Sequence, residues 1–76
     1  MVFYVLEFQT GVETGAVLPT AYTDRKQAEA AYHTLLAAAA VSNVRKHGAM
    51  LCNEDMFVIK QEVYTHYSEQ ETEEPA

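Results

Sequence analysis

The stretch from residue 24 to residue 40, DRKQAEAAYHTLLAAAA, decides the fold of this chain. Asp24 is a good helix N-cap, and Gln27 follows three residues later, as in a capping box. From residue 25 to residue 40 there is no glycine or proline, and residues of high helix propensity predominate. The apolar residues recur at helical spacing and form one stripe: Ala28, Tyr32, Leu35, Leu36 and Ala39. The sequence therefore predicts one helix over 25–40 whose stripe packs on a sheet.

Two strands are predicted before this helix. Residues 2–10, VFYVLEFQT, are rich in β-branched and aromatic residues. Alternation places Val2, Tyr4, Leu6 and Phe8 on one face, and Phe3, Val5, Glu7 and Gln9 on the other. Residues 11–15, GVETG, predict a turn, and residues 16–23, AVLPTAYT, predict a returning strand. Pro19 has no N–H to donate, so we expect this returning strand at a sheet edge.

Two more strands are predicted after the helix. Residues 44–53, VRKHGAMLCN, form a moderate strand candidate that Gly48 weakens, and residues 53–55 form a polar turn. Residues 56–67, MFVIKQEVYTHY, are a strong strand candidate. Alternation places Phe57, Ile59 and Val63 on one face, and Val58, Lys60, Glu62, Tyr64 and His66 on the other.

The expected fold is therefore α+β, a four-stranded antiparallel sheet with one helix packed on one face, in the order β-β-α-β-β. We expect a single domain over residues 1–67 and a disordered acidic tail over 68–76. One helix can cover only one face of such a sheet, and the strand order stays open. We expect the uncovered face to be lined in part by Phe3, Val5, Val58 and Tyr64 and to form an oligomer interface. A strongly twisted sheet that tolerates these exposed residues is the alternative.

The length and the cysteine content favour self-association. A chain of 76 residues buries only about 60% of its unfolded surface, so its core needs reinforcement. Cys52 is the only cysteine and cannot pair within the chain, which fits a reducing compartment such as the cytoplasm. His33, His47 and His66 lie too far apart in sequence to form a zinc framework, so no metal is expected. A homodimer or higher oligomer is the expected reinforcement, and no signal peptide or membrane span is predicted.

The negative net charge belongs mainly to the predicted tail. The chain has a formal net charge of −6, and residues 68–76 hold four glutamates and no base. The rest of the chain has seven acidic and five basic residues, a difference of only two. This balance gives no electrostatic argument for a nucleic-acid partner, and direct nucleic-acid binding is not expected.

Motifs for catalysis are missing from the sequence. There is no nucleophile elbow, P-loop or dinucleotide-binding glycine pattern. Cys52 and His47 are an odd number of residues apart on one strand and point to opposite faces, so their geometry is poor for a nucleophile and its base. Cys52 is expected to be a small buried hydrophobe. We therefore predict no catalytic residues, no cofactor and no enzyme activity.

Weak candidate ligand sites remain. Glu62, Tyr64 and His66 form a row on one strand face that could hold a ligand, although a solvated face has the same pattern. Two basic pairs, Arg25-Lys26 and Arg45-Lys46, could bind an anion such as a nucleotide, alone or with Tyr64 and His66. Asp24 as the helix cap would oppose an anion at the first pair. We expect the first hairpin turn and the end of the helix to lie at opposite ends of the helix, so the two pairs need not meet within one subunit, but they could meet in an antiparallel dimer. Ordinary solubilising charge is the alternative.

The stretch 24–42, DRKQAEAAYHTLLAAAAVS, followed by KHGAML at 46–51 and EVYTH at 62–66, resembles a family of short proteins from bacteriophages and mobile elements of gut Firmicutes. The matching positions include Glu29, Tyr32, His33, Leu36, the alanines at 37–40, Val41 and Ser42, then His47, Gly48 and Ala49, then Tyr64 and His66. The resemblance carries no established activity and no binding residue.

What the resemblance implies is a context in which small proteins act by stoichiometric binding. Two functions follow as expectations. The first is a homo-oligomeric binding protein that docks on a host or phage protein through its open sheet face or sheet edge. The alternative is a sponge that sequesters a nucleotide-type anionic signal and so counters host defence.

Overall fold

The computed structural model describes residues 1–66 and confirms the predicted fold class. Strands β1 (Phe3–Thr10) and β2 (Gly15–Tyr22) form the first hairpin, and helix α1 (Arg25–Ala40) follows. Strands β3 (Lys46–Asn53) and β4 (Val58–Thr65) form the second hairpin. The end of the predicted domain at residue 67 and the predicted tail over 68–76 lie outside the described residues.

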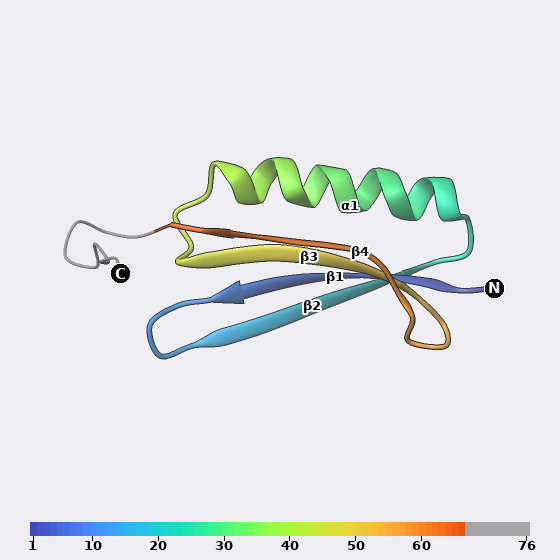
Figure 1. The fold of residues 1–76 in the computed structure, drawn as a ribbon, viewed down its shortest axis with the longest axis horizontal. Coiled ribbons are helices and arrows are strands. Elements are labelled where there is room, and N and C mark those ends of the chain that lie inside the picture. Colours follow the sequence, from blue (N-terminus) through green and yellow to red (C-terminus); the bar gives the residue numbers. More distant parts are fainter. Residues whose placement is uncertain (67–76) are drawn as a thin grey trace.

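All neighbouring strands of the sheet are antiparallel, in the order β2-β1-β3-β4 (Figure 1). The strand with Pro19 is an edge strand, as predicted. Pro19 lies opposite Leu6, and this pair must be one whose backbone groups point away from each other, because proline has no N–H to donate. The nitrogen of Pro19 therefore faces the outer edge of the sheet.

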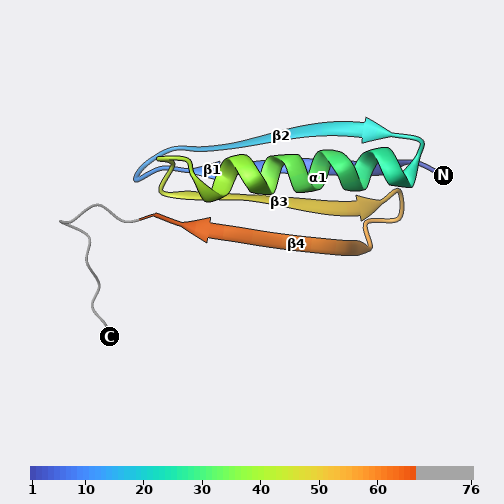
Figure 2. The same cartoon turned by 90° about the horizontal axis from the view of Figure 1, so that it is seen from above.

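The handedness of one connection decides which face of the sheet the helix covers. β2 and β3 are both antiparallel to β1, which lies between them, so they run parallel to each other. The connection from β2 through α1 to β3 is thus a crossover, and seen from the helix side it moves in the right-handed sense (Figure 2). The helix lies over the two central strands, β1 and β3, in that view.

The helix runs from Arg25 to Ala40, as predicted, and Asp24 is its N-cap through a hydrogen bond from the Lys26 N–H to its carboxylate at 3.0 Å. Its buried residues are Ala28, Tyr32 and Ala39, three members of the predicted stripe. Ala28 and Tyr32 form the core cluster together with Val5, Ala49 and Leu51 from the central strands. Both the helix and the sheet contribute an alanine to this cluster, and Tyr32 is its largest side chain.

The predicted uncovered face was wrong in three of its four residues. Val5 is 1% exposed in the core, and Phe3 packs against that core. Tyr64 lies opposite His47 and shares the helix side of the sheet. Only Val58 is on the open side, opposite Cys52. Both faces of β1 carry apolar residues, so its alternation alone could not show which face the helix covers.

A β-bulge explains why Val58 and Tyr64 lie on opposite faces of the sheet. The register shifts between Leu51 and Cys52, whose partners are Lys60 and Val58, so Ile59 is an extra residue in β4. The predicted alternation along residues 56–67 is therefore broken at the bulge. Lys60, Glu62 and Tyr64 remain on one face, as predicted, while Val58 moves to the other.

The close approach of β4 explains why a glycine stands at position 48 of β3. A Cβ atom there would collide with the backbone carbonyl oxygen of Glu62 and come within 2.9 Å of the Val63 Cα atom. The glycine therefore lets β4 lie close to β3 at the centre of their pairing.

Candidate functional site

The sheet face opposite the helix, called the open face below, is the main exposed surface feature. The register assigns its residues, because directly paired residues point to the same side. Its apolar members are Tyr4, Leu6 and Phe8 from β1; Val17, Pro19 and Ala21 from β2; Met50 and Cys52 from β3; and Val58 and Val63 from β4. No helix or strand among residues 1–66 covers this face (Figure 1).

The open face is almost free of charge. The register places one charged residue on it, Lys46, at the end where Thr10 and Gly15 also lie. Four strands about 4.8 Å apart and eight residues long span roughly 19 by 26 Å, or about 500 Å². The largest apolar patch on a typical monomer is about 300–600 Å² and is often functional. The open face is therefore comparable in extent with the large apolar patches of monomeric proteins.

Cys52 lies within this face and is buried between Tyr4 and Val58. It behaves as the small buried hydrophobe that was predicted, and His47 points to the opposite side of the strand. Tyr4, Leu6 and Phe8 are the surface residues that sequence reasoning left out of the interface. The sequence shows that these three residues share one face of β1, but it does not show that this face lies opposite the helix.

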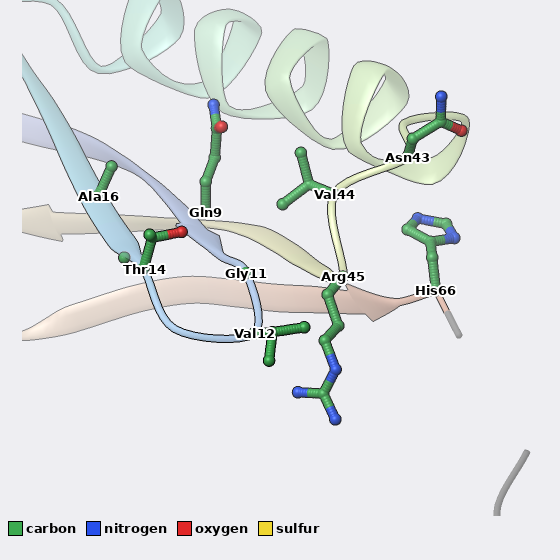
Figure 3. A pocket seen from close by; sticks show the side chains of 10 residues that line it. Gln9, Gly11, Val12, Thr14, Ala16, Asn43, Val44, Arg45 and His66 are labelled. Atoms are coloured by element: carbon green, nitrogen blue, oxygen red, sulfur yellow. The ribbon is translucent and has the colours of Figure 1, made fainter. Parts of the chain in front are cut away.

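A cavity of about 520 Å³ lies at the end of the sheet where β1 turns into β2 (Figure 3). It is lined by residues of the first hairpin and of the segment after the helix: Gln9, Gly11, Val12, Thr14, Gly15, Ala16, Asn43, Val44, Arg45 and His66. The prediction that the first turn and the helix end lie apart was wrong. β1 leads away from the helix start, β2 returns and α1 runs forward again, so both lie at one end (Figure 1).

This cavity brings together two of the predicted ligand residues, Arg45 and His66. In Figure 3 the Val44 side chain points toward Gln9, while the Arg45 side chain extends away from the helix. Arg25, Lys26, Lys46 and Tyr64 do not line it. The Arg25-Lys26 pair is at the start of the helix and lies at the other end of the fold (Figure 1). The two basic pairs therefore do not meet within one chain.

The predicted row of Glu62, Tyr64 and His66 lies along the edge strand on the helix side. The Tyr64 and His66 rings stack with their centroids 6.5 Å apart. His66 Nε2 lies 2.8 Å from the Ala39 carbonyl oxygen, and because a carbonyl only accepts, the histidine donates. His66 therefore satisfies one of the last carbonyls of the helix. Burial raises the pKa of the Tyr32 phenol, and the nearby Glu62 and Tyr64 raise it further.

Arg25 is part of an ion-pair cluster with Glu29 and Lys60. Its Nε lies 3.0 Å from Glu29, and the Lys60 ammonium lies 3.1 Å from the other oxygen of that carboxylate. The hydrogen bond from Arg25, and then that from Lys60, hold the pKa of Glu29 below its ordinary value of 4.5. The cluster ties the first turn of the helix to β4.

A buried polar network, which the sequence analysis did not find, joins the sheet to the loop after the helix. His47 is 6% exposed, with Nε2 2.7 Å from Glu7 and Nδ1 2.8 Å from the Ser42 hydroxyl. Gln9 also donates to Glu7, at 2.9 Å. A carboxylate only accepts, so His47 donates to Glu7, and the Ser42 hydroxyl is placed to donate to Nδ1. The network satisfies the polar groups that β1 carries beneath the end of the helix.

Glu7 and Gln9 were visible as polar residues on an otherwise apolar strand face. Their partner could not be found by spacing, because His47 is forty residues from Glu7 in sequence. Residues 1–66 hold no cluster of three or more side chains that could bind a metal ion. No helix among these residues has the length and apolar character to cross a membrane.

No family model, curated protein or solved structure matches this chain.

Proposed function

We propose that this protein is a small non-catalytic binding protein that acts as a homo-oligomer and holds a host or phage protein in a fixed stoichiometry. The observation that supports the proposal is the open face, an apolar and nearly uncharged surface on a four-stranded sheet. Covering such a surface releases water from apolar groups, which is the main favourable term in protein association. Its low charge also fits the core of a protein interface, where charged residues are depleted.

The small size of the core supports the same proposal. Among the described residues the buried apolar side chains larger than alanine are Val5, Tyr32, Leu51 and Cys52. Several large apolar residues remain exposed on the open face, including Val17, Val58 and Val63. Burying such side chains against another protein contributes roughly 25 cal/mol per Å² of apolar area. A bound partner therefore adds stability that the isolated chain lacks.

Two neighbouring residues of β2 give a matched test of this surface. Val17 is 52% exposed and Leu18 is 49% exposed, but Val17 is on the open face and Leu18 is on the helix side. We expect Val17→Lys to abolish capture of the partner protein, because it places a charge in the apolar interface. We expect Leu18→Lys to leave capture unchanged. Affinity capture followed by native mass spectrometry measures the partner and its molar ratio.

Equal capture by both variants would contradict a role for the open face. Sedimentation tests the other half of the proposal, since the wild-type chain should form an oligomer in the micromolar range. A monomer at all accessible concentrations would contradict homo-oligomeric action.

A second candidate function is sequestration of a nucleotide-type anion, and the cavity at the first turn favours it. Arg45 and His66 line that cavity together with polar groups of Thr14 and Asn43. Calorimetry against a panel of nucleotides tests this candidate, with Arg45→Ala as the variant that should lose binding. A panel in which nothing binds more tightly than about 0.1 mM, or about −5.5 kcal/mol, would remove it.

A further inference from the structure

The two edges of the sheet differ in their capacity to pair with another strand. On β2 the nitrogen of Pro19 faces outward, so the middle of that edge lacks a donor. Proline is one of the devices that keep edge strands from pairing with other chains. β4 has no proline, and no described element lies beside its outer side. The edge of β4 is therefore the one that can accept another strand.

The register shows which backbone groups of β4 point outward. The His66 N–H donates to the Arg45 carbonyl at 2.7 Å, so the facing backbone groups of this pair point toward each other. Alternation along the ladder then directs the backbone groups of residues 60, 62 and 64 toward β3. The N–H and C=O groups of Gln61, Val63 and Thr65 therefore lie in the plane of the sheet and point to the outer side of β4. The bulge at Ile59 limits this regular edge to residues 61–65.

We propose that this edge pairs antiparallel with β4 of a second copy of the chain, with Val63 opposite Val63 on the two-fold axis. The proposal rests on the self-association proposed above and names its route. Gln61 of each copy then lies opposite Thr65 of the other. Three residue pairs result, and each exchanges two N–H···O bonds.

Neighbouring registers are less favourable. If Glu62 lies on the two-fold axis, it faces Glu62 of the second copy, and like charges directly opposite each other destabilise a sheet. If Tyr64 lies on the axis, only Val63 and Thr65 find outward-facing partners within residues 61–65. In the proposed register Glu62 lies opposite Tyr64 of the second copy, which brings no like charges together. The choice of register thus follows from the charge and from the number of bonds.

This pairing has a consequence for the open face. The two-fold axis is perpendicular to the sheet, so both helices lie on one side and both open faces join on the other. One open face covers about 500 Å², whereas a standard protein interface buries about 800 Å² on each partner. Two joined faces cover about 1,000 Å². Dimerisation through β4 therefore makes one binding surface of the standard size.

Amide hydrogen exchange on the full 76-residue chain tests the pairing directly. The amides of Gln61, Val63 and Thr65 have no acceptor in the ladder of one chain, so protection of these amides requires a second strand. We expect them to exchange as slowly as the amides of Glu62 and Tyr64, and to lose protection on dilution to the monomer. Fast exchange in a chain that sediments as an oligomer would overturn the edge pairing but not the self-association. A monomeric wild-type chain would overturn both.

Two substitutions at one residue separate edge pairing from packing of the open faces. Val63→Pro removes the outward N–H and stays apolar, and the ladder to β3 does not use that N–H. Val63→Thr keeps the N–H and makes the side chain polar. Edge pairing predicts at least a tenfold weaker dimer for Val63→Pro and little change for Val63→Thr in sedimentation. The reverse order would overturn it.

A second variant guards against misfolding at residue 63. Gln61→Pro removes another outward N–H and should weaken the dimer in the same way, while circular dichroism reports whether each variant is folded. If Val63→Pro unfolds, Gln61→Pro and the exchange measurement decide. Protection that persists on dilution would assign the edge to a segment of the same chain and overturn the proposal.

Discussion

The two faces of the sheet are built from alternate residues of the same strands, yet they do different work. The helix side holds the core, with Val5, Ala49 and Leu51 under the helix, and a polar network around His47 beneath the helix end. The open face holds Leu6, Phe8 and Met50, and Lys46 is the one charged residue that the register places on it. On the helix side the polar side chain of His47 has partners within the chain, Glu7 and Ser42.

The largest expected difference between the faces concerns two neighbours on β3. Leu51 is fully buried under the helix, and Met50 points to the open face. Leu51→Ala should lower the free energy of unfolding by about 3 kcal/mol, because it removes core contacts and leaves a cavity. Met50→Ala should cost about 1 kcal/mol or less at protein concentrations where the chain is monomeric. Urea denaturation measures both, and equal losses would show that the open face is also covered in the monomer.

The polar network beneath the helix end should be the next most sensitive feature. His47→Leu leaves Glu7 and Ser42 without their imidazole partner, so we expect a loss of about 2 kcal/mol in the free energy of unfolding. His33 is exposed on the helix, and His33→Leu is the matched control, with a change within about 0.5 kcal/mol. Thermal or urea unfolding at neutral pH measures the difference. A His47→Leu variant as stable as the control would show that the network is dispensable.

Tyr32 gives the helix side a dependence on alkaline pH. Burial raises the pKa of this phenol above its ordinary value of 10.0 in the folded chain. The unfolded chain therefore loses this proton first, and stability that is present below pH 10 declines as the pH rises through the folded pKa. Tyr32→Phe should remove this part of the alkaline decline. Tyr4→Phe, on the open face, should leave the Tyr32 contribution in place, and a decline equally reduced in both variants would contradict the assignment.

The smallest effect is expected at the ion-pair cluster of Glu29 with Arg25 and Lys60. The pKa of Glu29 is lowered in the folded chain, so the cluster stabilises it above pH 4.5 and this contribution is lost as the pH falls through the folded pKa. Wild type and Glu29→Gln should therefore differ at neutral pH and converge in acid or in high salt. Glu13→Gln removes one charge from the turn between β1 and β2, far from the cluster in sequence, and serves as the control. A difference between wild type and Glu29→Gln that persists in acid would exclude a role for the carboxylate charge.

Much of the architecture follows from local sequence signals. Asp24, the uninterrupted run to Ala40 and the apolar stripe predict the helix with its observed ends. Apolar runs separated by polar turns predict all four strands to within two residues, although the third run lacks the β-branched and aromatic residues of the others. Pro19 marks its strand as an edge, because a missing N–H is a property of the residue itself.

The candidate surfaces followed less well from the sequence. Phe3 and Val5 were expected on an interface and lie in the core, since β1 is apolar on both sides and its alternation cannot choose between them. Val58 and Tyr64 were expected on one face, but the bulge at Ile59 separates them. Arg45 and His66 were predicted as ligand residues without the turn of the first hairpin that completes their cavity.

What the sequence determined by itself is therefore local: the helix, the strands, the edge proline and the absence of familiar catalytic motifs. The tertiary structure decided the strand order, the side of the sheet that the helix covers, and the pairing of His47 with Glu7. These are non-local properties, set by the right-handed crossover from β2 to β3 and by the register between strands far apart in the chain. The same two constraints leave Leu6, Phe8 and Met50 on the open face and the backbone of Val63 at a free edge.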